Sequence, residues 1–167
     1  SIPQASAGRL LVFGGGDAAL FARLLPELSC LGSEPRRVGT VEQAAILKLA
    51  LNQIIPMQAA TFCLSLAMVR RSGIEVERFM EILRGSAFHS PSFDARLGRY
   101  LARDYERPNF PLELLGKDVE LAREEARHLD LPTVTLDAVE ALIERALERD
   151  LGRADYGALY EAIDPSR

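Results

Sequence analysis

The sequence has few of the residues that build metal centres, disulfide frameworks or nucleic-acid surfaces. Among its 167 residues are two cysteines and two histidines, and 20 Lys and Arg stand against 24 Asp and Glu, a net charge of −4. Cys30 and Cys63 are not in CxxC spacing, and His89 and His128 have no partner at ligand or triad spacing. We therefore predict no metal site and no Ser/His/Asp centre, and the acidic balance gives no support for nucleic-acid binding.

The cysteines and the first residues allow expectations about the cellular compartment and about whether the chain is part of a longer protein. Cys30 and Cys63 lie in apolar segments expected to be helical, which predicts buried free thiols in a reducing compartment, and hence a cytoplasmic protein. No basic stretch followed by an apolar run opens the chain, so no signal peptide is expected. The chain starts at Ser1 without an initiating Met and leads at once into strand-like residues, so we expect a piece of a longer protein.

Hydrophobic periodicity predicts a short α/β start followed by helices alone. Residues 9–13 predict a strand, residues 17–31 a helix, and the stretch through Val38 a possible second strand. Residues 86–93 are expected to form a loop. Helices are predicted over residues 41–71, 74–83, 94–103, 111–128, 134–149 and 156–163.

The stretch LLVFGGGDAALFARLL, residues 10–25, has the form of a phosphate-binding turn. Gly14, Gly16 and Ala19 satisfy the pattern G-x-G-x-x-A, and Glu34 lies at the distance expected of a ribose ligand. A small nucleotide-binding protein that uses this turn is therefore one hypothesis.

Three features favour a simpler interpretation of that turn. Asp17 would place a negative charge beside the pyrophosphate, Pro26 interrupts the helix, and only one further strand follows. We therefore predict that the glycines turn the chain from strand to helix and that Asp17 is the N-cap.

The predicted helix over residues 41–71 is long and largely apolar. Residues 49–69 carry no formal charge, so length alone would allow a membrane span. Polar residues are scattered through this stretch, which favours a helix buried in a core or dimer, and we predict no membrane span. The polar residues are Asn52, Gln53, Gln58, Thr61 and Ser65, and Pro56 lies among them.

Two lysines are candidates for chemistry. Lys48 and Asn52 are four residues apart and share one helix face. Lys48 either covers apolar surface with its stem while its amine reaches water, or it is a desolvated proton donor beside an amide that orients a substrate. Lys117, next to Asp118, is by itself a surface pair of little energetic weight.

Taken together, three segments resemble the β-hydroxyacid dehydrogenases, which include 3-hydroxyisobutyrate dehydrogenase and the glyoxylate/succinic semialdehyde reductases. SIPQASAGRL is similar to the end of their substrate-binding motif, A-x-x-G-x-L, with Ser1 as the last residue of its serine–glycine turn. VGTVEQAAILKLALN is similar to G-x-x-G-x-G-x-x-x-K-x-x-x-N, with Lys48 and Asn52 in place. FPLELLGKDVELA is similar to F-x-L-x-x-x-x-K-D-x-x-x-A, with Phe110, Lys117 and Asp118 in place.

The resemblance implies a mainly α fold: an all-helical domain like the C-terminal domain of 6-phosphogluconate dehydrogenase, with a long first helix. It would occupy residues 41–167, after a short α/β remnant of a Rossmann domain over residues 1–40. The family's G-x-G-x-x-G fingerprint lies upstream of the motif at Ser1 and is absent from this sequence. The chain is therefore expected to be the C-terminal portion of a longer enzyme and to be inactive alone.

The resemblance also implies residue roles. The parent enzyme would transfer a hydride between NAD or NADP and a small β-hydroxy acid or semialdehyde, with Lys48 as general acid and base. Ser1, Asn52 and Phe110 would bind the substrate, and Lys117 and Asp118 would contact the cofactor. The long helix would build much of a homodimer interface. The two lysine amines would converge in a water-poor cleft.

Some positions depart from the family pattern and leave alternatives open. Glu42 and Ala44 stand where the family usually has glycines, Leu64 where a glutamate is common, and Pro56 should kink the long helix. These changes are compatible with a non-catalytic helical dimerisation or interaction module. An imine reductase, a related group on the same fold, is a further alternative that the presence of Lys48 argues against.

Overall fold

The computed structural model describes residues 2–165, which form two compact units. The first unit extends to Leu51 and the second begins at Asn52. The domain boundary predicted at residues 40 and 41 remains a prediction, because compactness alone does not assign a domain.

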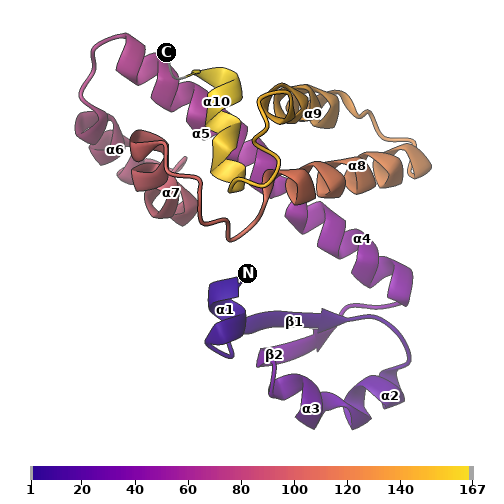
Figure 1. Cartoon of the computed structure of the whole chain (residues 1–167). Helices are drawn as coiled ribbons and strands as arrows, with labels where there is room; N and C mark the ends of the chain where they lie inside the picture. Colours follow the sequence, from indigo (N-terminus) through magenta and orange to yellow (C-terminus); the bar gives the residue numbers. More distant parts are fainter. Residues whose placement is uncertain (1, 166–167) are drawn as a thin grey trace. The chain divides into compact units, whose positions relative to one another are not determined.

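The first unit holds a small parallel sheet with helices beside it, and the second unit is helical (Figure 1). The first unit contains α1 (Ile2–Ser6), β1 (Leu10–Gly14), α2 (Ala18–Arg23), α3 (Leu25–Ser29), β2 (Gly32–Arg37) and most of α4 (Val41–Asn52). The second contains α5 (Ile54–Arg71), α6 (Val76–Arg84), α7 (Pro91–Ala102), α8 (Leu112–His128), α9 (Val134–Leu147), the 3₁₀ helix η1 (Tyr156–Leu159) and α10 (Tyr160–Ile163).

The sheet of the first unit is a single parallel pair. β1 and β2 pair from Leu10 opposite Gly32 to Gly14 opposite Arg37, with an irregularity between Leu11 and Phe13. Among the described residues of this unit, only Gly32 is buried. A two-stranded sheet with so little core is marginally stable by itself, because parallel sheets normally bury both faces.

The glycine turn after β1 is a structural strand-to-helix turn, as predicted. Gly16 has φ 131°, and a Cβ on Gly15 would lie 1.9 Å from the carbonyl oxygen of Thr40. Asp17 is the N-cap of α2 and accepts a hydrogen bond from the Leu20 N–H at 2.8 Å. The turn is therefore shaped by a close backbone approach and by helix capping.

The predicted fold class is wrong in treating the α/β part as a short remnant before an all-helical domain. α4 does not start the helical unit: its residues to Leu51 belong with the sheet. The periodicity over residues 41–71 did not show this division, because a helix pattern does not reveal which unit the helix packs with.

The long helix is interrupted at one residue. Gln53 separates α4 from α5, three residues before Pro56. Proline lacks an N–H and its ring clashes with the carbonyl four residues earlier, here that of Asn52, so the break falls within the turn before Pro56. By length and composition alone, residues 41–71 are long and apolar enough to cross a membrane.

The second unit packs around α5, which runs between the α6–α7 pair and the α8–α9 pair (Figure 1). Towards α6, α7 and α10, α5 packs Phe62, Cys63 and Leu66, and the Phe62 and Phe93 rings stack with centroids 4.5 Å apart. Ala59 packs towards α8, α9 and η1. The predicted core role of this helix is thus confirmed for α5.

The C-terminal segment ties the helices together through a buried carboxylate. Asp155 is fully buried and accepts hydrogen bonds from Arg96 and from the Gly157 and Asn109 N–H groups at 3.0 and 3.1 Å. Its second oxygen lies 3.6 Å from Arg99. Such a carboxylate is stable in a protein interior because three hydrogen bonds and a second guanidinium group stabilise its negative charge.

The strand predicted over residues 9–13 is confirmed as β1 (Leu10–Gly14), and α1 precedes it. Two local expectations from the sequence are wrong. α7 begins at Pro91 inside the expected loop, because proline is favoured at the first position of a helix. Cys30 is exposed, because it caps the C-terminal end of α3, whereas Cys63 is buried; both are free.

Candidate functional site

The candidate site is centred on Asp118 in α8. Leu112, Leu115, Val119 and Ala122 form the buried face of this helix. The Asp118 side chain keeps 17% of its surface exposed beside that face, and the neighbouring Lys117 side chain keeps 60%. The helix thus places a carboxylate at the edge of the core with an ammonium beside it.

Asp118 joins two of the sequence motifs. Its Oδ2 accepts a hydrogen bond from Asn52 Nδ2 at 2.8 Å, and its Oδ1 lies 3.0 Å from Lys117 Nζ. Asn52 ends α4 and belongs to the second unit. The structure therefore brings Asn52 together with the adjacent pair Lys117 and Asp118, although Asn52 and Asp118 are 66 positions apart in the sequence.

Phe110, the other predicted substrate-binding residue of the second unit, is held in place by the C-terminal segment. The Tyr156 N–H donates to the Phe110 carbonyl at 2.9 Å, and the Leu112 N–H donates to the Ala154 carbonyl at 2.9 Å. The Phe110 and Tyr156 rings meet edge to face, with centroids 6.0 Å apart. Phe110 is half-buried and packs against the core, which suits the wall of a pocket.

The remaining predicted site residues are Lys48 and Ser1. Lys48 is exposed on α4, one turn before Asn52 on the same helix. Ser1 lies outside the described residues. The predicted convergence of the two lysines in a water-poor cleft stays a prediction, and both lysines are exposed in this chain.

The start of α4 is closed by a reciprocal cap. The Gln43 N–H donates to Thr40 Oγ1 at 3.3 Å, and the Thr40 N–H donates to Gln43 Oε1 at 2.9 Å, which is a capping box. A hydrogen bond from the Thr40 side chain lowers the pKa of Glu42. Glu42 is therefore an anion in the first turn of α4, where the family pattern has glycine.

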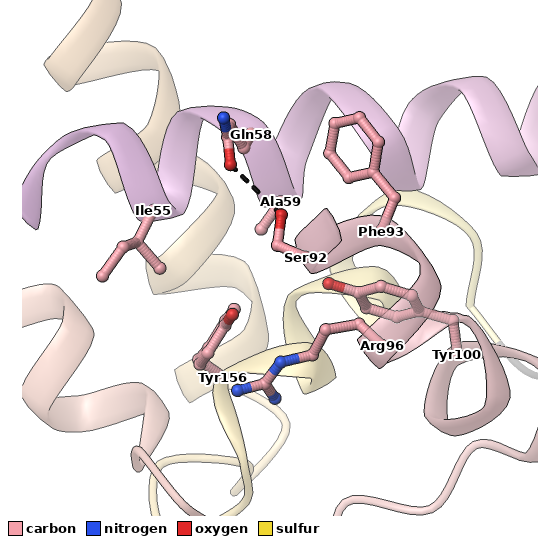
Figure 2. Close-up of a pocket in the computed structure, with 8 residues that line it drawn as sticks. All are labelled: Ile55, Gln58, Ala59, Ser92, Phe93, Arg96, Tyr100 and Tyr156. Carbon is pink, nitrogen blue, oxygen red and sulfur yellow. Dashed lines mark hydrogen bonds between the residues drawn. The ribbon is translucent and has the colours of Figure 1, made fainter. Parts of the chain in front are cut away.

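A small, partly enclosed cavity lies beside Tyr156 (Figure 2). Its volume is about 60 Å³, and Figure 2 shows Gln58 and Ser92 on one side and Arg96 with Tyr156 on the other. The walls come from α5, α7 and η1: Ile55, Gln58, Ala59, Ser92, Phe93, Arg96, Tyr100 and Tyr156. Sequence reasoning missed this cavity, since Ser92 was assigned to a loop and Arg96 belongs to no motif.

No group of three or more His, Cys, Asp or Glu residues that could hold a metal is present within residues 2–165.

Comparison with protein families decides the relationship. Residues 43–163 match the family described as NAD-binding of NADP-dependent 3-hydroxyisobutyrate dehydrogenase. The chain belongs to this dehydrogenase family. The resemblance inferred from the sequence is confirmed, and with it the expectation of a nicotinamide cofactor.

Relatives with known names agree with this assignment. The chain is 28% identical to glyoxylate/succinic semialdehyde reductase 1 of Arabidopsis thaliana, over 96% of this chain and 55% of the relative. It is 24% identical to 2-(hydroxymethyl)glutarate dehydrogenase of Eubacterium barkeri, over 93% of this chain and 52% of the relative. The chain thus spans about half the length of these relatives.

Solved structures show the same fold. 3-Hydroxyisobutyrate dehydrogenase of Salmonella typhimurium superposes with a TM-score of 0.83 at 22% identity, covering 96% of this chain and 56% of the other. The Mycobacterium tuberculosis enzyme superposes with a TM-score of 0.85 at 14% identity, covering 98% of this chain. Because the likeness includes the α/β unit, these structures also overturn the prediction of an all-helical domain with a short remnant.

The residues around Asp118 fit part of a nicotinamide cofactor, whereas the glycine turn does not fit its pyrophosphate. An ammonium has three donors, and Asp118 engages Lys117 from one direction only. Asn52 donates to Asp118 through its nitrogen, which leaves its carbonyl oxygen as an acceptor. By contrast, the Asp17 carboxylate already occupies the start of α2 and would repel a phosphate.

Proposed function

We propose that this chain is the substrate-binding and dimer-forming portion of an NAD(P)-dependent β-hydroxyacid dehydrogenase or semialdehyde reductase. The observation that carries the proposal is the hydrogen bond between Asn52 and Asp118. It brings Asn52, from the lysine–asparagine motif, into one polar group with Lys117 and Asp118 of the lysine–aspartate motif.

The proposed chemistry is a hydride transfer coupled to a proton transfer. A bound nicotinamide supplies the hydride to a carbonyl carbon in reduction and accepts it in oxidation. Lys48 donates a proton to the carbonyl oxygen as that carbon is reduced, and takes the hydroxyl proton in the reverse direction. Asn52 hydrogen-bonds the substrate oxygen, Phe110 walls the pocket, and Ser1 binds the substrate carboxylate.

Lys117 and Asp118 would hold the cofactor. The Asp118 carboxylate fixes the Asn52 amide and the Lys117 ammonium, so a substitution at Asp118 disturbs both. Since both lysines are exposed in this chain, we propose that the surroundings that exclude water are completed by a nucleotide-binding half and a second subunit. The isolated chain is then inactive and binds NAD(P) weakly.

A homodimer is proposed on the exposed face of α5. Ile54, Leu64 and Met68 keep 42%, 54% and 63% of their surface exposed, and with Met57 and Thr61 they repeat at alternating spacings of three and four residues. Such a stripe is typical of a helix that packs against another helix. The proposed compartment is the cytoplasm, on the ground of the two free thiols.

The experiment fuses this chain to the nucleotide-binding half of the Arabidopsis relative and measures NADPH consumption with glyoxylate, succinic semialdehyde and related aldehydes. We expect reduction of at least one substrate, with Lys48→Ala lowering kcat by about 10²–10⁴-fold. Leu47→Ala, on the same helix, is the control. A folded fusion that binds NADPH and is equally active with Lys48→Ala would contradict the proposal.

The second candidate, a non-catalytic dimerisation module, is favoured by Glu42 and Ala44 at positions where the family has glycines. In that case the fusion dimerises through α5 and binds NADPH, but it reduces no aldehyde of the panel.

A further inference from the structure

The cavity beside Tyr156 has the size of a small functional group. Its volume is about 60 Å³, and a water molecule needs roughly 10–15 Å³ by this measure, so it has room for about four to six water-sized atoms. A carboxymethyl group has that number of heavy atoms. A cofactor ring or a nucleotide does not fit.

Arg96 gives the cavity a positive wall. Its side chain is 16% exposed, and its guanidinium carbon lies 3.9 Å from the centre of the Tyr156 ring. One terminal nitrogen donates to Asp155. Because a guanidinium carries five N–H donors in a fixed plane, donors remain for a second acceptor.

The carboxylate partner of Arg96 does not cancel this charge. Asp155 is shared between Arg96 and Arg99, so two guanidinium groups surround one carboxylate and a single positive charge is left over. Asp155 also accepts from two backbone N–H groups, which stabilise its negative charge further. The group of Arg96, Arg99 and Asp155 therefore carries a net positive charge, and Arg96 is its member that lines the cavity.

The opposite wall adds adjustable polar groups. Ser92 donates to Gln58 Oε1 at 3.2 Å and lies 2.9 Å from Ser90 Oγ. A primary amide presents either an acceptor or two donors when it turns over, and a hydroxyl rotates freely, so both can donate to an anion. Ile55, Ala59 and Phe93 make the rest of the lining apolar, which suits a methylene stem.

We propose that this cavity is a carboxylate-binding pocket, with Arg96 as its anchor and Ser92 and Gln58 as its second wall. It borders Phe110, the residue proposed to wall the substrate pocket, because Tyr156 lines the cavity and its ring meets the Phe110 ring edge to face. Resting on the proposed function, the pocket receives the distal carboxylate of the substrate. The substrate class is then an acid with a second carboxylate rather than a short monocarboxylic one.

The test is an NMR titration of the ¹⁵N-labelled chain with sodium propionate and, separately, with propionamide, its uncharged counterpart. We expect propionate to shift the Gln58 side-chain amide and the backbone amides of Ser92, Phe93 and Tyr156. Propionamide should bind at least about tenfold more weakly, because it lacks the charge that Arg96 attracts.

Two variants test the place of binding without touching the Arg96–Asp155 pair. Ala59→Val fills the cavity and should weaken propionate binding at least tenfold, and Ser92→Ala should weaken it several-fold. Gly98→Ala is the matched control on α7, where an added Cβ meets nothing within 4 Å. Its affinity for propionate should equal that of the original chain.

The pocket is overturned if propionate and propionamide bind equally well, or if Ala59→Val binds propionate with unchanged affinity. It is also overturned if the shifts gather around the separate cavity lined by Arg103 and Arg149.

Glutarate distinguishes the substrate role from the pocket itself. If the pocket holds the far end of a substrate, glutarate should shift the Asn52 and Lys117 amides together with the cavity amides, whereas propionate shifts the cavity amides alone. Glutarate confined to the cavity overturns the substrate role. If propionate binds but the fusion shows no Lys48-dependent reduction, the proposed function is overturned and the pocket is retained. If the fusion shows Lys48-dependent reduction but propionate does not bind, the pocket alone is overturned.

Discussion

At the scale of single residues, the lysine and carboxylate motifs could be found in the sequence, but their partners could not. The spacing of Lys48 and Asn52 predicts a shared face, because helix periodicity is local. The contact of Asn52 with Asp118 spans 66 positions and depends on the packing of α8, which periodicity does not describe. The buried Asp155 was missed for the same reason. Its partners Arg96 and Arg99 lie on α7, far from it in the sequence, and local periodicity does not pair them with it.

Asp155 provides a test at this scale. Asp155→Asn removes the buried negative charge and leaves Arg96 and Arg99 without their counter-ion. We expect the free energy of unfolding to fall by about 3–5 kcal/mol, the usual cost of breaking a buried pair. Urea denaturation measures this, and Glu77→Gln, in a pair whose glutamate is 76% exposed, should cost less than about 1 kcal/mol. Equal small losses would show that Asp155 does not tie the helices together.

The link between α6 and α7 provides a pH test. Hydrogen bonds from His89, and next from Arg84, hold the pKa of Asp94 below its ordinary value of 3.8. A carboxyl with a lowered folded-state pKa stabilises the fold above its unfolded pKa, and that stabilisation is lost as the pH falls through the folded pKa. Unfolding free energies of the original chain and of Asp94→Asn should therefore differ at pH 6, and the difference should shrink as the pH falls below 3.8 and through the lowered pKa of Asp94. A difference that does not shrink as the solution is acidified below pH 3.8 would contradict this prediction.

At the scale of secondary-structure elements, most helices were predicted because their apolar periodicity is strong. α8 and α9 begin within one residue of their predicted starts, and Asp17 caps α2 as expected. Pro56 predicted a kink in the long helix, and the break falls at Gln53, in the turn before it. The start of α7 was missed, because a proline opens that helix inside the expected loop.

At this scale we predict that the exposed apolar stripe of α5 forms the dimer interface. Leu64→Glu together with Met68→Glu should raise the dimer dissociation constant by about a hundredfold or more, because burying a carboxylate in an apolar interface costs several kcal/mol. Sedimentation equilibrium measures the change. Val134→Glu on α9, at a position 73% exposed, is the control and should leave the constant unchanged. A monomeric original chain at micromolar concentration would contradict the proposed dimer.

At the scale of the whole molecule, the two units differ in how they are stabilised. All the buried hydrophobic residues of the described chain lie from Ala59 onward, in the second unit. The sequence composition averages over both units, so the poor core of the first unit was not visible in it. Under the proposed function, the sheet of the first unit is one that further strands of a nucleotide-binding domain would cover.

Hydrogen exchange tests this difference between the units. The amides of β1 and β2 should exchange faster than those of α5 by several powers of ten, because few buried contacts oppose local opening. Fusion to the nucleotide-binding half should slow exchange in β1 and β2 and leave α5 unchanged. If the amides of β1 and β2 in the isolated chain were as well protected as those of α5, the first unit would be stable without a nucleotide-binding half packed against it.

The central claim, that Lys48 moves the proton while a hydride passes to a carbonyl carbon, is tested most directly by isotope transfer. The fusion is given NADPH with deuterium at the transferable position and an accepted aldehyde, and the product is analysed by mass spectrometry over a single turnover. The account predicts one deuterium on the new carbinol carbon, formed at least about a hundredfold more slowly with Lys48→Ala. A product without deuterium, or labelled product formed at the same rate by Lys48→Ala, would contradict it.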